Sequence, residues 1–439
     1  MKKLLVVLLF SSFIFSNNQI PAPPQKQPIL LKNGFIHTVS NGTIKGAILF
    51  ENGKIMRIAE KISSSVGTKV VDLQGKHVYP GLIAAVSGIG LVEINAVPVT
   101  NDHSERGDFN PNVRANVAYN PDSKIIPTTR SNGVLIANVA PGSGLVSGQS
   151  SIMMMDGWTW EEATLLHPSG LHINWPNMEI RTGGRFQTPA KRQINQRQKA
   201  LKSLDKIIEN GRAYSKLRQT KSRKAEEYHN EDLRLESLLD YVNGNLPIYI
   251  HANEVRQIEA AVAWSKRLQL NIIIVGGRDA WRTTTLLKTN NVPVIYESVT
   301  SLPSRRFEDY DQAYKSPALL YQAGVQFCIA SSGSAGASYN VRNLPNHAAM
   351  AAAYGLPKDI ALRSVTLSVA EIIGIDKQVG SLEPGKDATL FISNGDPLDI
   401  RTNVLQAYIQ GRTIDMNDKH KTLYHKYQEK YRQLGILKE

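Results

Sequence analysis

The groups in this sequence that could carry chemistry follow apolar runs that are typical of buried strands. His251 comes directly after residues 246–250, and Ser331 and Ser332 follow residues 325–330. An imidazole at a strand end can bind a divalent metal or move a proton, and a Gly- and Ser-rich loop can bind an anion through backbone N–H groups. No serine is accompanied by a base and an orienting acid, so the pattern favours a strand-to-helix loop over a nucleophile.

Other polar residues could enter the same pocket from neighbouring loops. The pocket candidates are His251, Asn101, Asp102, Arg278, Ser331 and Ser332. Glu93, His103 and Asp279 lie near them in the sequence, but no pair has the spacing of a metal site. We interpret Glu93 and Asp102 as loop or cap residues for which a pocket role stays open. Four further histidines are interpreted as surface or structural residues: His167, His172, His229 and His347.

The elements that must position these residues alternate between strand and helix over residues 80–379. Apolar runs are followed by longer helical patterns, of which residues 254–268 and 346–354 are the clearest. Repeated strand-then-helix units predict a parallel sheet, and this many units in about 300 residues fit a (β/α)8 barrel of the α/β class. The expected strands are residues 134–139, 246–250, 271–275, 292–296 and 325–330.

Both ends of the chain have a different pattern. Residues 29–79 contain short strands separated by tight turns, which is typical of a small all-β unit, and strand signals return at residues 388–392 and 404–409. A polar, helical segment at about residues 191–243 is long enough to be an insertion over the barrel mouth. It is basic. A solvated helical face is favoured over a nucleic-acid surface because aromatic residues are sparse.

Several sequence motifs resemble those of a known family. Residues 72–83, beginning Asp-Leu-Gln-Gly-Lys, resemble the point where a β-sandwich strand leads into the barrel of the amidohydrolase superfamily. Residues 380–390 and 395–399 resemble the return into that sandwich, and residues 342–345 and 361–375 resemble the last barrel helices of its imidazolonepropionase-like branch. The resemblance implies a (β/α)8 TIM-like barrel over residues 80–379, a composite β-sandwich domain from residues 29–79 and 380–416, and a C-terminal helix at 417–439.

The same resemblance implies a metal site whose ligands are missing here. The family places a His-x-His pair after strand one, one His after strand five, one His after strand six and one Asp after strand eight. In this sequence Val86, Gly88, Gly276 and Ser332 occupy four of the five positions, and His251 alone retains its imidazole. We therefore expect His251 to be a vestigial ligand and expect no cofactor. Zinc or another divalent metal is expected only if substitute ligands exist.

The N-terminus indicates export. Residues 1–19 have the charged start, short apolar core and polar exit of a signal peptide, and the apolar run is too short to span a bilayer. We expect a periplasmic or extracellular protein without a transmembrane anchor, in which residues 20–28 form an extended linker. The single cysteine, Cys328, lies in an apolar run and is predicted to belong to the core.

Three functional hypotheses remain open. The first is an exported, non-catalytic protein that binds a small molecule or pairs with an active relative or with itself. The second is a metal-dependent hydrolase of carbon–nitrogen bonds whose ligands lie elsewhere in the sequence. The third is a cell-envelope interaction protein that uses the basic segment; nucleic acid is not an expected partner for any of them.

Overall fold

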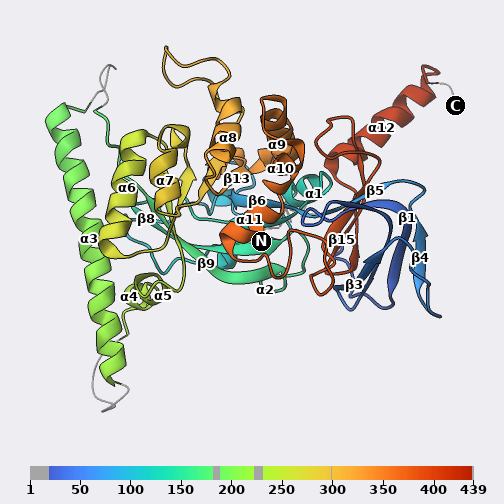
Figure 1. Cartoon of the computed structure of the whole chain (residues 1–439), viewed down its shortest axis with the longest axis horizontal. Coiled ribbons are helices and arrows are strands. Elements are labelled where there is room, and N and C mark those ends of the chain that lie inside the picture. The colour runs from blue at the N-terminus through green and yellow to red at the C-terminus, as the bar shows by residue number, and fades with distance from the viewer. Residues whose placement is uncertain (1–18, 181–187, 222–230, 298, 438–439) are drawn as a thin grey trace, which may run out of the picture.

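In the computed structural model, residues 19–180, 188–221, 231–297 and 299–437 are described. Their strands form two sheets that lie next to each other, with helices around one of them (Figure 1). Residues 1–18, which make up nearly all of the predicted signal peptide, lie outside the described residues, as do His229 and part of the basic segment. No helix among the described residues is long and apolar enough to cross a membrane.

The first sheet is a nearly closed eight-stranded barrel. Its strands follow the chain order from β6 to β13, and β13 returns to lie beside β6. The strands are β6 (Leu82–Ser87), β7 (Val134–Val139), β8 (Val146–Met154), β9 (Thr164–Asn174), β10 (Ile248–Ala252), β11 (Ile272–Gly276), β12 (Val294–Glu297) and β13 (Phe327–Ala330).

One strand departs from the expected all-parallel barrel. β8 pairs antiparallel with both β7 and β9, whereas the other neighbouring strands in this sheet pair in parallel. The cause is the length of the connections. Residues 140–145 are too few for the helical crossover that a parallel neighbour requires, so the chain must reverse. Residues 155–163 hold only the single-turn helix α2 (Trp160–Ala163).

Helices cover the outside of the barrel after its later strands. They are α6 (Val255–Leu268), α7 (Thr284–Thr289), α8 (Gln312–Gln322), α9 (Leu344–Ala353) and α10 (Lys358–Arg363). Inside, Tyr249, Val275 and Ile295 pack with Cys328 in a core that α11 (Leu367–Ile373) also joins. Cys328 is therefore a core residue, and burial raises the pKa of its thiol.

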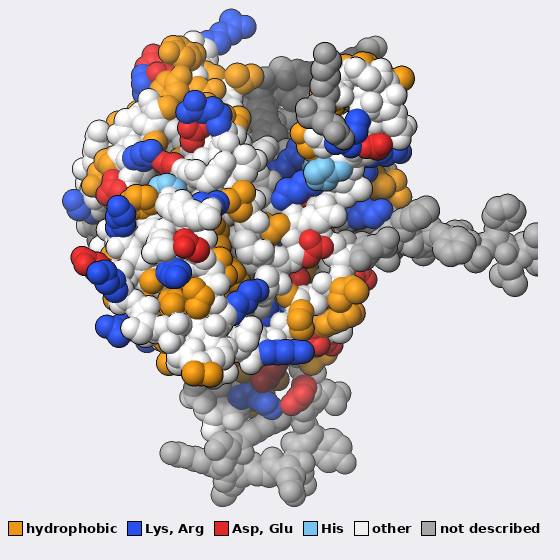
Figure 2. Space-filling model, turned by 90° about the vertical axis from the view of Figure 1, so that its right-hand side faces the viewer, with side chains coloured by type: hydrophobic (Ala, Val, Ile, Leu, Met, Phe, Trp, Pro, Cys, Tyr) orange, Lys and Arg blue, Asp and Glu red, His pale blue; other side chains and the backbone are white. Residues whose placement is uncertain are grey.

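The second sheet contains strands from both ends of the chain. β5 (His77–Pro80) pairs in parallel with β1 (Ile29–His37) and antiparallel with β14 (Leu390–Ser393). The remaining strands are β2 (Thr43–Glu51), β3 (Lys54–Ala59), β4 (Lys69–Asp72), β15 (Val404–Ile409) and β16 (Arg412–Ile414). They form one continuous sheet with a core of its own. Figure 2 looks onto this side of the molecule, where Lys and Arg side chains are scattered among neutral ones.

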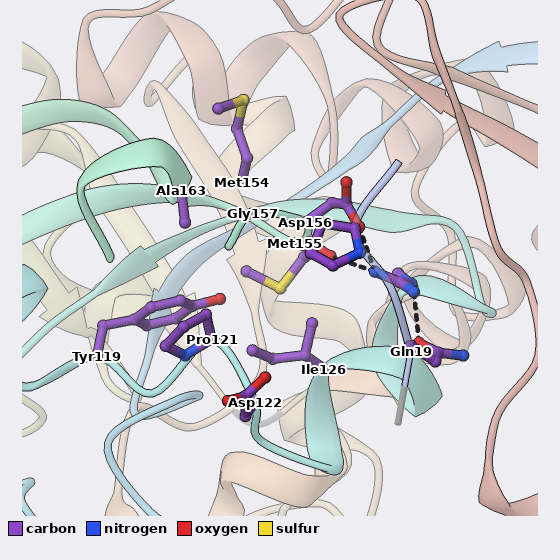
Figure 3. A pocket seen from close by; sticks show the side chains of 12 residues that line it. Gln19, Tyr119, Pro121, Asp122, Ile126, Met154, Met155, Asp156, Gly157 and Ala163 are labelled. Carbon is purple, nitrogen blue, oxygen red and sulfur yellow. Dashed lines mark hydrogen bonds and ion pairs between the residues drawn. The ribbon is translucent and has the colours of Figure 1, made fainter. Parts of the chain in front are cut away.

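The segment before β1 is docked on the fold. The Ala22 N–H donates to Asp156, a buried carboxylate that also forms ion pairs with Arg130 and Arg412. The Gln25 side chain bonds to backbone groups of Phe50 and Gly53. The segment is therefore held against both the barrel and the sheet. The small hollow beneath them has a volume of about 10 Å³ and suits a water molecule at most (Figure 3).

The basic segment forms one long helix and two short ones. α3 (Ala190–Lys221) stands against α6 on the outer wall of the barrel (Figure 1), where the Trp264 indole N–H donates to Asp205. α3 lies on this wall because Leu204 and Ile208, one turn apart, give it a short apolar surface that is buried there. The short helices are α4 (Leu233–Glu236) and α5 (Leu239–Val242).

Candidate functional site

A cavity of about 290 Å³ lies at the carboxyl ends of β11, β12 and β13. One wall is the loop that precedes α8, and Arg305 ties this loop to the barrel by two hydrogen bonds to the buried Asp279 carboxylate. The volume is close to the lower limit for small-molecule sites. The lining consists of Asn253, Arg278, Asp279, Trp281, Tyr296, Glu297, Ser332 and residues 301–304, 308, 312, 313 and 316.

The structure separates the predicted pocket residues into two groups. Arg278 and Ser332 line the cavity. Asn101 and Asp102 do not. The Asn101 side chain bonds to Asn95 and to the backbone N–H of His103, and Asp102 is exposed. Ser331 does not line the cavity either. Its side chain is buried, and its Oγ has no hydrogen-bond partner.

His251 is the next-to-last residue of β10 and is paired with a second histidine. Its Nε2 lies 2.9 Å from Nδ1 of His172 on β9, so one ring nitrogen donates and the other accepts. His172 is fully buried, stacks on Tyr249 and is therefore a structural residue of the barrel interior. Burial, reinforced by the neighbouring His103, lowers the pKa of His251 to about 4, and burial holds the pKa of His172 well below its ordinary value. Both rings are neutral at pH 7.

A third histidine fills the space beside Gly88. A Cβ atom built on Gly88 would lie 2.8 Å from Ser338 Oγ and 3.0 Å from Cδ2 of His103. His103 is buried, its Nε2 bonds to the Gly333 carbonyl at 3.0 Å, and burial lowers its pKa. Gly142 makes room for it, because a Cβ there would lie 1.8 Å from the imidazole. The second position of the family's strand-one pair is therefore covered by a loop histidine.

Gly276 is closed to a side chain for two reasons. Its φ is +96°, a conformation that residues with a Cβ rarely adopt, and a Cβ there would lie 2.6 Å from Oδ1 of Asn253. Asn253 follows β10 and lines the cavity. An amide side chain therefore occupies the space where the family has its strand-six histidine.

Glu297 is the carboxylate at the centre of this arrangement. It ends β12, lines the cavity and accepts a hydrogen bond from the Gly333 N–H at 2.6 Å. A Cβ on Gly333 would lie 2.8 Å from Cγ2 of Val86 and 3.3 Å from Oε1 of Glu297, which places Val86, the other strand-one position, beside this carboxylate. Burial raises the pKa of Glu297 to about 7, so the group can gain or lose a proton near neutral pH.

Comparisons with known proteins agree on one superfamily. A model of the amidohydrolase family matches residues 283–419, which include Glu297 and Ser332. Amidohydrolase tasK of Hapsidospora irregularis is 23% identical over 400 residues, which cover 83% of this chain and 39% of that protein. This chain thus spans about two fifths of the length of that curated relative.

Solved structures show the same fold. An amidohydrolase from Thermotoga maritima MSB8 has a TM-score of 0.77 and 25% identity over 88% of this chain and 99% of its own. A prolidase complexed with N-methylphosphonate-L-proline has a TM-score of 0.55 and 16% identity over 88% of this chain and 99% of its own, a likeness that shows the fold alone. The family-model match, the curated relative and the Thermotoga maritima structure together support the assignment to the amidohydrolase superfamily.

The superfamily implies a divalent metal at the barrel mouth, and the residues present do not fit one. Across the described ranges, no three His, Cys, Asp or Glu side chains lie close enough to hold a metal ion. His251 Nε2 is engaged by His172, and His103 Nε2 by a carbonyl. The Nε2 of His172 is buried without a hydrogen-bond partner. A transition-metal site needs three or four ligands, and this nitrogen supplies only one.

Glu297 and His172 are among the site residues that were not singled out from the sequence. Glu297 directly follows the expected strand at 292–296, and a carboxylate at the carboxyl end of a barrel strand is a usable signal for a site residue. His172 could not be found in this way, since its contact with His251 requires β9 and β10 to be neighbours. That pairing follows from the reversed β8.

Proposed function

We propose that this chain is a non-catalytic amidohydrolase-like protein that binds a small organic ligand in the cavity beside Glu297. The observation that carries the proposal is that other side chains fill the space at two positions where the family has metal-binding histidines. The His103 imidazole covers Gly88, and the Asn253 amide covers Gly276, whose backbone also disfavours any side chain. These positions are filled by other groups of the barrel mouth, so a single reversion would not restore a metal site.

The cavity lining favours a small carboxylic acid as the ligand. The Arg278 side chain is 36% exposed, its two ion-pair distances are 3.7 and 3.9 Å, and its Nε has no hydrogen-bond partner. A guanidinium with such loose ion pairs can donate two hydrogen bonds to the carboxylate of a ligand. Trp281 and Leu302 supply apolar surface, and the protonated Glu297 can donate a hydrogen bond to the same ligand.

Calorimetric titration with a series of carboxylates of increasing size, from acetate to benzoate, tests the ligand class. We expect saturable binding that Arg278→Gln weakens by about tenfold, the usual effect of losing one charge-assisted pair. The matched control is Arg306→Gln, because Arg306 is exposed and is not among the cavity lining. Equal weakening by both variants, or no binding by any carboxylate, would contradict the proposal.

The alternative is a hydrolase of carbon–nitrogen bonds. One observation favours it: a carboxyl group with a pKa of about 7 in a cavity suits proton transfer near neutral pH. A screen with amide and cyclic amide substrates separates the two functions. Turnover that is lost in Glu297→Gln and kept in the exposed-site variant Glu60→Gln would support the hydrolase, whereas absence of turnover in the wild type supports the binding protein.

Export and pairing with an active relative are further parts of the proposal. They are supported by the leader pattern of residues 1–19 and by the missing metal ligands, respectively. N-terminal sequencing of protein recovered from outside the cytoplasm tests export, and we expect the chain to begin near Gln19. Protein that retains Met1 and stays with the cytoplasm would contradict it.

A further inference from the structure

The C-terminal helix α12 (Lys419–Gln433) is fixed to the body only at its beginning. The buried Asp418 caps the helix by accepting from the N–H groups of His420 and Lys421, and it accepts a 2.6 Å hydrogen bond from Ser131. Beyond this turn no residue of α12 is buried, and the helix extends away from the sheet domain (Figure 1). The helix contributes almost nothing to the core, so packing within the chain does not explain its apolar residues.

The exposed helix has a continuous apolar stripe. Tyr424, Tyr427, Tyr431 and Leu434 recur at spacings of three and four residues, which puts them on one face. Their exposed fractions are 64%, 49%, 44% and 61%, and Leu423 beside them is also exposed. Large apolar side chains in this arrangement usually bury their stripe against a partner.

Positive charges flank the stripe on both sides. At 3.6 residues per turn, Lys419, Lys426 and Lys430 fall on one side of it, and Lys421 and Arg432 fall on the other. The only carboxylate of α12, Glu429, falls opposite the stripe. A second copy of the helix would bring like charges together along the contact, whereas an anionic surface would neutralise them.

We propose that α12 is an interfacial helix that binds anionic lipid membranes. Tyrosine rings have an apolar body and a polar tip, so they suit the headgroup level of a bilayer. The flanking lysines reach anionic headgroups on both sides, which is the arrangement of helices that lie in the membrane plane. The helix would hold the barrel at a membrane surface without crossing it.

Vesicle co-sedimentation tests this proposal with a chain that begins at Gln19, because the apolar residues 4–15 would bind lipid by themselves. Vesicles of phosphatidylglycerol and phosphatidylcholine in about equal amounts are compared with phosphatidylcholine alone. We expect binding to the anionic vesicles to be at least about tenfold stronger and to weaken at high salt. Replacing Tyr424, Tyr427 and Tyr431 together by Ser should reduce it by about tenfold.

Two matched controls separate α12 from the rest of the surface. Phe307→Ser with Tyr310→Ser removes aromatic rings elsewhere that are even more exposed, and Lys199→Glu with Lys202→Glu reverses charges on α3. Both should leave binding unchanged, whereas Lys426→Glu with Lys430→Glu should abolish the preference for anionic vesicles. Binding that ignores the tyrosines, or that follows the α3 charges, would overturn the proposal. A lipid-free dimer that the tyrosine variant dissociates, without vesicle binding, would overturn it in favour of self-association.

Discussion

The barrel mouth has two sides that differ in what they leave accessible. On one side, His172, His251 and His103 bond to one another or to backbone, and burial keeps their rings neutral. On the other side, Glu297 and Arg278 face a cavity of about 290 Å³. The Gly333 peptide joins the two, since its carbonyl bonds to His103 and its N–H to Glu297. The imidazoles are buried and hydrogen-bonded, whereas the carboxyl group that titrates near neutral pH lies at the end of β12.

The largest expected effect concerns the histidine side. Below pH 6.5 the unfolded chain protonates His251, whereas the folded chain resists protonation until about pH 4. The free energy of unfolding should therefore fall as the pH drops from 6.5 to 4, by up to about 3 kcal/mol for this residue. Urea unfolding across this range should show a shallower decline for His251→Gln. His425→Gln, on the exposed helix α12, is the control, and identical pH profiles for both variants would break the contrast between the two sides.

A smaller effect is expected at Gly276. Alanine there must adopt a φ of +96° and displace the Asn253 amide, so Gly276→Ala should lower the free energy of unfolding by about 2 kcal/mol more than a matched glycine substitution. The match is Gly42→Ala, because Gly42 has a φ of +76° and no atom within 4 Å of its built Cβ. Equal losses in chemical unfolding would show that the Asn253 side chain does not close the strand-six position.

The cavity side should show the opposite pH dependence. Because the folded pKa of Glu297 is raised to about 7, its contribution to stability is full below pH 4.5 and is lost as the pH rises through 7. Glu297→Gln keeps an acceptor for the Gly333 N–H and removes the charge, so it should stabilise the fold by up to about 3 kcal/mol at pH 8 and leave it unchanged at pH 4.5. Thermal unfolding at the two pH values measures this, with the exposed Glu60→Gln as control. A destabilised variant at pH 8 would contradict the buried-carboxylate account.

The sequence predicted the barrel and its strands better than it predicted the site. Residues 246–250 and 271–275 carry their strand signal locally, in apolar periodicity, and the structure places β10 and β11 there. The reversal of β8 was missed because direction depends on connection length, which the repeated strand-then-helix pattern obscures. The resemblance to the family pointed to Gly88 and Gly276 as positions without a ligand side chain. The groups that replaced them, His103 and Asn253, are fixed by loop and strand packing that only coordinates reveal.

The central claim is that the barrel mouth no longer holds a metal, and elemental analysis of the purified chain tests it most directly. The account predicts zinc, manganese and iron far below one per chain, in wild type and in His251→Ala alike, because within the described part of the chain no group of three His, Cys, Asp or Glu side chains could hold a metal ion. About one tightly held metal ion per chain, lost in both His251→Ala and His172→Ala and retained in His425→Ala, would contradict it and return the hydrolase function to first place.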